Sequence, residues 1–268
     1  MVDAKFTHVV DIHSHLLPGL DDGSSSWQET LAMAQMAVAE GISTMVVTPH
    51  QLGNFAKNTG DQIRERTTEL QRFLQSHQVP LNVLPGGDVR IEPEMMRGLQ
   101  QSDVLTLADR GRHVLLELPH EIYFPLEPVL EQLGAAGYVG ILSHPERNHG
   151  LQRSPEVLGP LVDHGCLMQV TAGSLTGLFG QASCELSKWM LNEGLVHVIA
   201  TDAHGCKVRR PRIQQALRLV AQWTDSPTAQ ALGCQNPQSI VCGQEVAGGR
   251  RRKSARKWAR WFQRGRAA

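Results

Sequence analysis

The chain has 268 residues, of which 41% are hydrophobic and 19% charged, a composition that is ordinary for a globular protein and excludes a disordered or fibrous one. Its 26 basic side chains match its 26 acidic ones, so the formal net charge is +0, without the basic excess typical of proteins that bind nucleic acid or anionic membranes. The balance hides a division, because residues 248–268 hold 9 basic side chains and no acid, which leaves residues 1–247 with a formal −9.

The cysteines and the N-terminus indicate the cellular compartment. The five cysteines are odd in number and show no CxxC spacing, so we expect free thiols in a reducing environment. The first residues, MVDAKFTHVVDIHSH, lack the basic and apolar segments of a signal peptide, and no apolar run approaches the ~20 residues of a membrane span. We therefore expect a cytoplasmic protein.

Short runs rich in β-branched residues predict seven strands, most of them separated by segments with helical periodicity. These runs are residues 8–12, 44–48, 81–84, 114–118, 139–143, 167–171 and 196–201. Residues 26–40 predict a helix, with Ser26 and Glu29 as a capping box and Gly41 at C′. The alternation is typical of a parallel α/β fold.

Seven strands in about 245 residues without a linker favour a closed or nearly closed barrel over two domains. An open doubly wound sheet is the alternative, but no GxGxxG motif follows the first strand. The composition changes at Gly248 and Gly249. We therefore expect one domain, residues 1–247, followed by a basic, aromatic-containing tail at residues 248–268.

Histidines and carboxylates fall at the carboxyl ends of six of the seven predicted strands. They are Asp11, His13, His15, Asp21 and Asp22 after the first strand, and then His50, Asp88, Glu117, His144, Asp202 and His204. The carboxyl ends of barrel strands converge on one mouth, so side chains remote in sequence would meet there. His13 and His15 share one strand face and can reach one metal, and Asp202 and His204 repeat that spacing. A single histidine or aspartate after a strand is more often a surface residue or a helix cap, but their coincidence predicts a metal site.

The donor types indicate the metal and its chemistry. Imidazoles and carboxylates without a cysteine suit Mn²⁺, Fe²⁺ or Zn²⁺ better than a soft metal. About nine candidate ligands exceed the needs of one ion, so we expect two or three ions with bridging groups, an arrangement suited to phosphoester hydrolysis. Candidate phosphate ligands in the same loops are Arg147, Lys207, Arg209 and Arg210. For Arg209 and Arg210, a solvated helix start near Pro211 is the alternative interpretation.

Residues 206–212, CKVRRPR, formally satisfy the CX5R spacing of cysteine-dependent phosphatases. That chemistry needs a thiolate in a loop whose backbone N–H groups face the phosphate, but this segment has no glycine, and Pro211 removes one donor. We therefore interpret the match as chance. The remaining histidines lack such placement, and we expect them to be structural or exposed: His8, His77, His113, His120, His149, His164 and His197.

Six motifs carry a family resemblance. They are DIHSHLLPGLDDGS at 11–24, TPH at 48–50, GGDVRI at 86–91, LLELP at 115–119, SHPERN at 143–148 and ATDAHG at 200–205. Over nearly all of residues 8–245 the chain resembles the bacterial manganese-dependent protein-tyrosine phosphatases of capsule and exopolysaccharide loci, in the polymerase and histidinol phosphatase (PHP) superfamily. Within that superfamily, HxH followed by DDG is specific to this family.

The resemblance implies a distorted seven-stranded, TIM-like β/α barrel with a trinuclear metal centre. It also implies that the substrate is phosphotyrosine on the tail of a partner tyrosine kinase that controls polysaccharide export. Arg147 would hold the phosphate, with His50 or Asp22 as candidate general acids. By position, the metal ligands would be His13, His15, Asp22, His50, Asp88, Glu117, His144, Asp202 and His204. Two departures from the family are Asp88, where glutamate is usual, and the lack of a basic cluster in residues 51–54 after TPH.

Other functions and partners also fit the sequence. The same metal site could act on a small phosphate monoester such as histidinol phosphate, or the protein could be a weakly catalytic regulator that binds the kinase tail. We expect no nucleic-acid partner, and a homo-oligomer is compatible with the sequence. In residues 250–266, bases alternate with Trp258, Trp261 and Phe262 at helical spacing, which predicts docking on anionic lipid at the inner membrane face, against the alternative of a disordered terminus.

Overall fold

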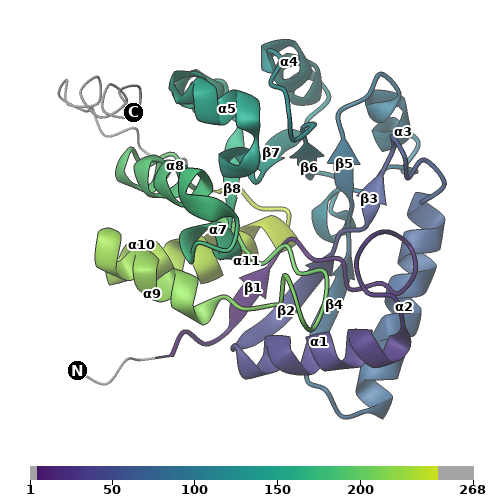
Figure 1. Cartoon of the computed structure of the whole chain (residues 1–268). Coiled ribbons are helices and arrows are strands. Elements are labelled where there is room, and N and C mark those ends of the chain that lie inside the picture. Colours follow the sequence, from purple (N-terminus) through teal and green to yellow (C-terminus); the bar gives the residue numbers. More distant parts are fainter. Residues whose placement is uncertain (1–4, 247–268) are drawn as a thin grey trace.

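The computed structural model describes residues 5–246 (Figure 1). Its strands are β1 (Val9–Asp11), β2 (Ile42–Val47), β3 (His50–Gln51), β4 (Asn82–Pro85), β5 (Asp88–Arg90), β6 (His113–Glu117), β7 (Val139–Ser143), β8 (Leu167–Thr171) and β9 (Val198–Ala200). Its α-helices are α1 (Trp27–Ala39), α2 (Gly60–Ser76), α3 (Met95–Gln100), α4 (Glu127–Ala135), α5 (His149–Arg153), α6 (Leu158–Asp163), α7 (Ala172–Leu175), α8 (Gly180–Asn192), α9 (Gln214–Trp223), α10 (Ser226–Gln230) and α11 (Asn236–Val241). Shorter turns are η1 (Leu107–Asp109), η2 (Pro145–Arg147), η3 (Pro155–Val157) and η4 (Ala231–Gln235). The predicted tail and its lipid-docking face lie outside the described residues.

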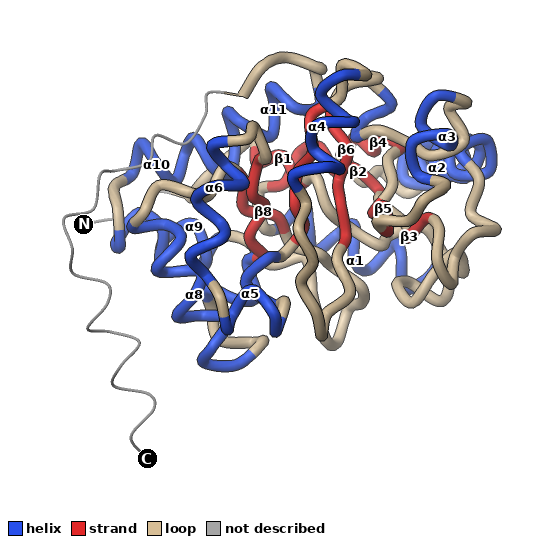
Figure 2. The backbone as a smooth tube through the Cα atoms, turned by 90° about the horizontal axis from the view of Figure 1, so that it is seen from above, coloured by secondary structure: helices blue, strands red, loops and turns tan. Residues whose placement is uncertain are grey.

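The strands form two parallel sheets within a single α/β domain. One sheet has the order β1-β2-β4, and the other has the order β3-β5-β6-β7-β8-β9. Helices lie around the strands, which occupy the middle of the molecule (Figure 2). Within residues 5–246, no helix has both the length and the apolar character needed to cross a membrane.

The predicted seven-stranded barrel is not confirmed, because residues 5–246 form nine strands in two sheets. The two additional strands, β3 and β5, follow the predicted strands at residues 44–48 and 81–84. Thr48 and Pro49 separate β2 from β3, and Gly86 and Gly87 separate β4 from β5. Pro49 has no N–H to donate to a neighbouring strand. The Thr48 N–H donates instead to the Ser14 carbonyl at 2.7 Å. Pairing in the first sheet therefore stops at these points, and β3 and β5 pair in the second sheet.

Backbone pairing on either side of these interruptions places the strand ends next to one another. β3 pairs with β5 so that His50 lies opposite Asp88. An isolated parallel bridge joins Ser14, after β1, to Ala203, after β9. The first and last strands of the chain therefore end side by side, and the segments that carry the predicted ligands are held by main-chain hydrogen bonds.

Helix α1 begins and ends where the sequence predicts. The Ser26 hydroxyl accepts the Glu29 N–H at 3.3 Å. The second hydrogen bond of the predicted capping box is wrong. The Glu29 carboxylate accepts from the N–H and hydroxyl of Ser25, one residue before the N-cap. Gly41 follows the helix with φ of +82°, and a Cβ there would lie 2.5 Å from the Phe6 carbonyl oxygen. Glycine is therefore required where the chain turns into β2.

Apolar strand residues alternate between two buried clusters. In β6, Val114 and Leu116 belong to a large cluster that includes side chains of the surrounding helices. Leu115, between them, belongs to a smaller cluster together with Ile141 of β7 and Val10 of β1. Successive side chains on a strand point to opposite faces, and both faces are covered here. This explains why the strands read as almost continuous apolar runs.

Replacement of Ile141 by alanine should destabilise the fold by about 2–5 kcal/mol, because Ile141 is fully buried in the smaller cluster and its truncation leaves a cavity. Chemical denaturation monitored by circular dichroism measures the loss. Ile122→Ala is the control, since Ile122 is 55% exposed and its truncation should change the free energy of unfolding by less than about 0.5 kcal/mol. Equal effects of the two changes would contradict this assignment of the core.

Candidate metal centre

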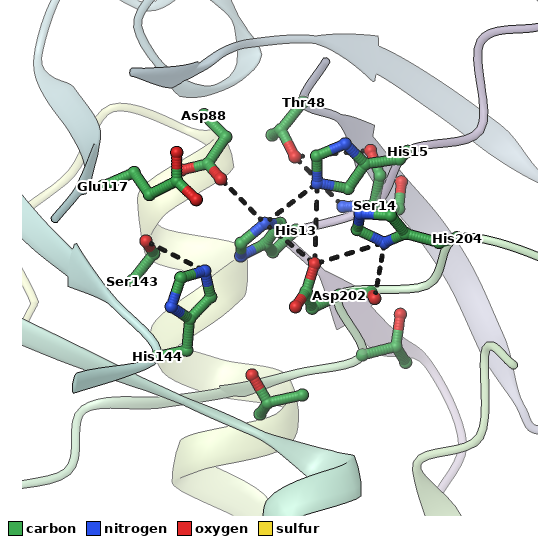
Figure 3. Close-up of polar contacts among 12 residues, drawn as sticks. His13, Ser14, His15, Thr48, Asp88, Glu117, Ser143, His144, Asp202 and His204 are labelled. Carbon is green, nitrogen blue, oxygen red and sulfur yellow. Dashed lines mark hydrogen bonds and ion pairs between the residues drawn. The ribbon is translucent and has the colours of Figure 1, made fainter. Parts of the chain in front are cut away.

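The nine predicted ligands lie close together, and Figure 3 labels all of them except Asp22 and His50. His13 and His15 follow β1, Asp22 precedes α1, His50 and Asp88 begin β3 and β5, Glu117 ends β6, His144 follows β7, and Asp202 and His204 follow β9. Four overlapping groups have their ligand atoms within 4.8 Å of one another: His15, Asp22, His50 and His204; His13, His15 and Asp88; His13, His144 and Asp202; and His50, Asp88 and Glu117. The structure thus brings all nine side chains together, and their role as ligands stays a prediction.

Two of these side chains project from strained backbone. His144 has φ of +35° and Asp202 has φ of +51°, a backbone conformation that residues other than glycine rarely adopt. Each residue follows within two positions of a strand end, where the chain turns away from its sheet. Such strain costs on the order of 1–3 kcal/mol and is found preferentially at functional sites. The surrounding fold therefore holds these two side chains in place at a cost in stability.

His13 and His15 are held with their Nε2 atoms facing each other. His15 Nδ1–H donates to Asp21 Oδ2 at 2.6 Å, and His13 Nδ1–H donates to Gln169 Oε1 at 2.8 Å. In the neutral rings each Nε2 then offers a lone pair, and the two Nε2 atoms are 3.3 Å apart. The two lone pairs repel each other at this distance, whereas a cation bound by both nitrogen atoms would make the arrangement favourable. Asp21 and Gln169 would then orient the ligands through their outer hydrogen bonds.

The buried carboxylates of the cluster also need positive charge nearby. Both Asp88 oxygens, Asp202 Oδ1, His50 Nδ1 and His204 Nε2 are buried without a hydrogen-bond partner in the described chain. Such atoms are costly to bury unless something else pairs with them. Burial opposes protonation of His13 and His50, yet the surrounding carboxylates raise the pKa of His13 to about 9 and that of His50 to about 11. Protons or divalent ions must supply this positive charge, and the nitrogen and oxygen donors fit Mn²⁺, Fe²⁺ or Zn²⁺.

Two arginines lie beside the cluster and share one of its carboxylates, that of Asp202. The guanidinium groups of Arg147 and Arg209 both donate to Asp202 Oδ2, Arg209 at 2.6 Å. The other oxygen of Asp202 lies 3.2 Å from His13 Nε2, inside the cluster. The Phe179 ring lies 4.2 Å from Arg147 Cζ and 5.9 Å from Arg209 Cζ. An anion that reaches the cluster from this side meets two guanidinium groups.

The remaining predicted site residues lie around this arrangement. Lys207 and Arg210 are exposed, and Arg210 Nε donates to the Lys207 carbonyl at 2.9 Å. Among residues 5–246, neither side chain forms a hydrogen bond or ion pair with the nine clustered residues, so their phosphate binding stays a prediction. His50 and Asp22, the candidate general acids, form a pair at the mouth with 3.4 Å between Nε2 and Oδ1. Their catalytic role also stays a prediction.

Sequence reasoning missed several residues near the site. The sequence does not predict Gln169 or Phe179 near the site, and it predicts His120 outside the site, although the His120 ring lies 5.5 Å from that of His144. The available signals were weak: Gln169 is a polar residue within an apolar strand, and His120 follows Glu117 by three positions.

Two other predictions concerned residues away from the cluster. His113 and His197 are structural, since burial lowers the pKa of each to about 4 and leaves them neutral at physiological pH. The CX5R match is unsupported because Cys206 Sγ faces the Glu29 carboxylate at 3.8 Å. The thiol therefore faces an acidic side chain, whose charge would repel a phosphate anion.

Comparisons with known proteins identify relatives of this chain. A family model described as capsular polysaccharide synthesis, CpsB/CapC, matches residues 9–242. The chain is 36% identical to the tyrosine-protein phosphatase YwqE of Bacillus subtilis over 211 residues, or 78% of this chain and 82% of YwqE. It is 26% identical to the tyrosine-protein phosphatase CpsB of Streptococcus pneumoniae over 244 residues, or 89% of this chain and 100% of CpsB. A solved chain from work on YwqE and CpsB, described as unique metal-dependent tyrosine phosphatases, superposes with a TM-score of 0.87 at 32% identity, covering 92% of this chain and 100% of that one.

Proposed function

Because the chain belongs to the CpsB/CapC family of capsular polysaccharide synthesis, as its motifs predict, we propose that it is a metal-dependent tyrosine-protein phosphatase. The substrate in this proposal is phosphotyrosine on the tail of a partner tyrosine kinase of the polysaccharide export machinery. The observation that carries it is the meeting of nine imidazole and carboxylate side chains beside Arg147 and Arg209. We place the protein in the cytoplasm, and we interpret its two sheets as an incompletely closed barrel.

The proposed cofactor is Mn²⁺, with two or three ions held by the nine clustered side chains, and Fe²⁺ or Zn²⁺ as alternatives. When bound, such ions lower the pKa of water and neutralise phosphate oxygens. Asp88 is one methylene shorter than the glutamate usual in the family, so its carboxylate lies closer to the β5 backbone. The shorter side chain of Asp88 would therefore alter the spacing of the metal ions or the choice of metal.

The protein side chains then bind and orient the phosphate. Arg147 and Arg209 present planar donors that suit phosphate oxygens, and Asp202 aligns both of them. A tyrosine phenolate has a pKa of about 10, so the leaving group needs little proton donation. A proton held between His50 and Asp22 at the mouth would meet that need.

Metal removal tests the proposal. Protein stripped by a chelator should lose hydrolysis of a phosphotyrosine peptide and regain it with Mn²⁺, while elemental analysis counts two or three ions per chain. Cys206→Ser is the control and should keep full metal-dependent activity. Activity that survives chelation but is lost in Cys206→Ser would overturn the proposal.

The same assay separates the alternative functions. Faster turnover of histidinol phosphate than of the phosphopeptide would favour a small-molecule phosphatase. Binding of the phosphopeptide by metal-loaded protein without phosphate release would favour a regulator.

A further inference from the structure

A basic groove lies beside the metal centre. Its volume is about 670 Å³, and it lies between the turn that joins α7 to α8 and the segment that leads into α9. Figure 1 shows α7, α8 and α9 on one side of the molecule. Five of the side chains that line the groove are cationic: Lys207, Arg209, Arg210, Arg212 and Arg218.

These cations have little internal compensation. Glu40 is the one acid among the described residues that line the groove, and its Oε2 already accepts the N–H groups of Ile213 and Gln214 at 3.0 and 2.9 Å. Within residues 5–246, only Arg209 of the five cations forms an ion pair, with Asp202. The positive charge of the groove is therefore available to a ligand, although residues 1–247 as a whole carry a formal −9.

Apolar side chains distinguish this groove from a site for a small anion. Leu178 is 54% exposed and Val208 is 69% exposed, and both line the groove. Large hydrophobic side chains are otherwise seldom exposed in the described part of this chain. A groove with cations and exposed apolar groups suits an extended peptide better than an isolated phosphate.

The groove is continuous with the metal centre through Arg209 and Phe179. Arg209 lines the groove and also donates to Asp202 at 2.6 Å. Phe179 lines the groove and packs against the guanidinium of Arg147. A chain whose phosphorylated residue sits at the metal centre would therefore run directly into the groove.

We propose that this groove docks an acidic segment of the same peptide that carries the phosphotyrosine. The inference rests on the proposed function and adds a determinant of substrate choice. Aspartates and glutamates near the phosphotyrosine would pair with Arg212 and Arg218, which lie outside the phosphate-binding set. Complementary charge of this kind favours the right partner and speeds association.

The test uses the full-length, Mn²⁺-loaded protein and the double variant Arg212→Gln/Arg218→Gln. Three substrates are compared: a phosphotyrosine peptide with acidic flanking residues, the same peptide with those residues changed to alanine, and p-nitrophenyl phosphate. Wild-type protein should prefer the acidic peptide through a lower KM, and this preference should shrink as salt rises. The double variant should lose about tenfold in kcat/KM on the acidic peptide and less than about twofold on the other two.

A matched control removes two arginines elsewhere. Arg72→Gln/Arg97→Gln changes the net charge equally on exposed sites of α2 and α3, away from α8 and α9 (Figure 1), and should keep the acidic preference. Equal loss on all three substrates in the groove variant, or equal loss in the control variant, would overturn the inference. Metal-dependent phosphotyrosine hydrolysis without an acidic preference would overturn this inference alone, whereas absence of such hydrolysis would overturn the proposed function.

Discussion

Asp202→Asn is expected to lower kcat/KM for a phosphotyrosine peptide on the order of 10³-fold or more. Asp202 Oδ1 faces His13 in the cluster, and Oδ2 accepts both Arg147 and Arg209. Asparagine keeps the shape but replaces one oxygen with an N–H₂ donor, which cannot coordinate a cation or accept from arginine. Asp202→Asn must therefore lose either the interaction inside the cluster or the hydrogen bonds from the two arginines. Steady-state turnover and elemental analysis measure the two consequences, and both activity and bound metal should fall.

The matched control for this change is Asp109→Asn. Asp109 also pairs with an arginine, Arg64, at 2.8 Å, but on the surface and in no ligand group. Exposed ion pairs contribute little to the stability of a fold, so Asp109→Asn should keep its activity and its bound metal. Wild-type metal content together with full turnover in Asp202→Asn would remove Asp202 from the proposed site.

The positions of the predicted site residues followed from a simple regularity. In parallel α/β folds the carboxyl ends of strands face one edge, so a residue just after a strand is already placed in space. His50 and Asp88 illustrate this, because each follows a strand by three positions, β2 and β4 respectively. They lie 38 positions apart in sequence and yet are opposite each other where β3 and β5 begin. Such placement needs only strand ends and residue types, both of which can be read from the chain.

The orienting residues could not be predicted in this way. Gln169 hydrogen-bonds His13 across 156 positions of sequence, and nothing local marks it as a partner. Phe179 lies in a turn between two helices and reaches Arg147 only through the tertiary fold. These contacts depend on the packing of separate elements, for which sequence periodicity carries no signal.

The short strands β3 and β5 could not be predicted for a different reason. β3 has two residues and β5 has three, which is too few to show alternation, and the Gly86–Gly87 pair reads as the end of the preceding strand. Gly87 has a structural cause that appears only in three dimensions, since a Cβ there would lie 2.3 Å from Gln51 Oε1. The Gln51 side chain is held there by hydrogen bonds to Asn58, Asp103 and Leu105, so its close approach favours glycine at position 87.

Arg147→Ala should lower kcat/KM for the phosphopeptide by about 10²- to 10³-fold, because it removes a charged donor beside the cluster. Bound metal should stay at the wild-type level, since Arg147 belongs to none of the ligand groups and Arg209 still pairs with Asp202. This pattern separates a phosphate-binding role from that of Asp202, whose loss should reduce both quantities. Inhibition by inorganic phosphate offers a second readout and should weaken in parallel.

Arg147→Lys provides the matched control for geometry. Lysine keeps the positive charge but lacks the planar fork that donates two parallel hydrogen bonds, and it would stack less well on the Phe179 ring. We therefore expect partial recovery, with kcat/KM between those of Arg147→Ala and the wild type. If metal content falls in step with activity in both variants, Arg147 acts by holding Asp202 in place and does not bind the phosphate.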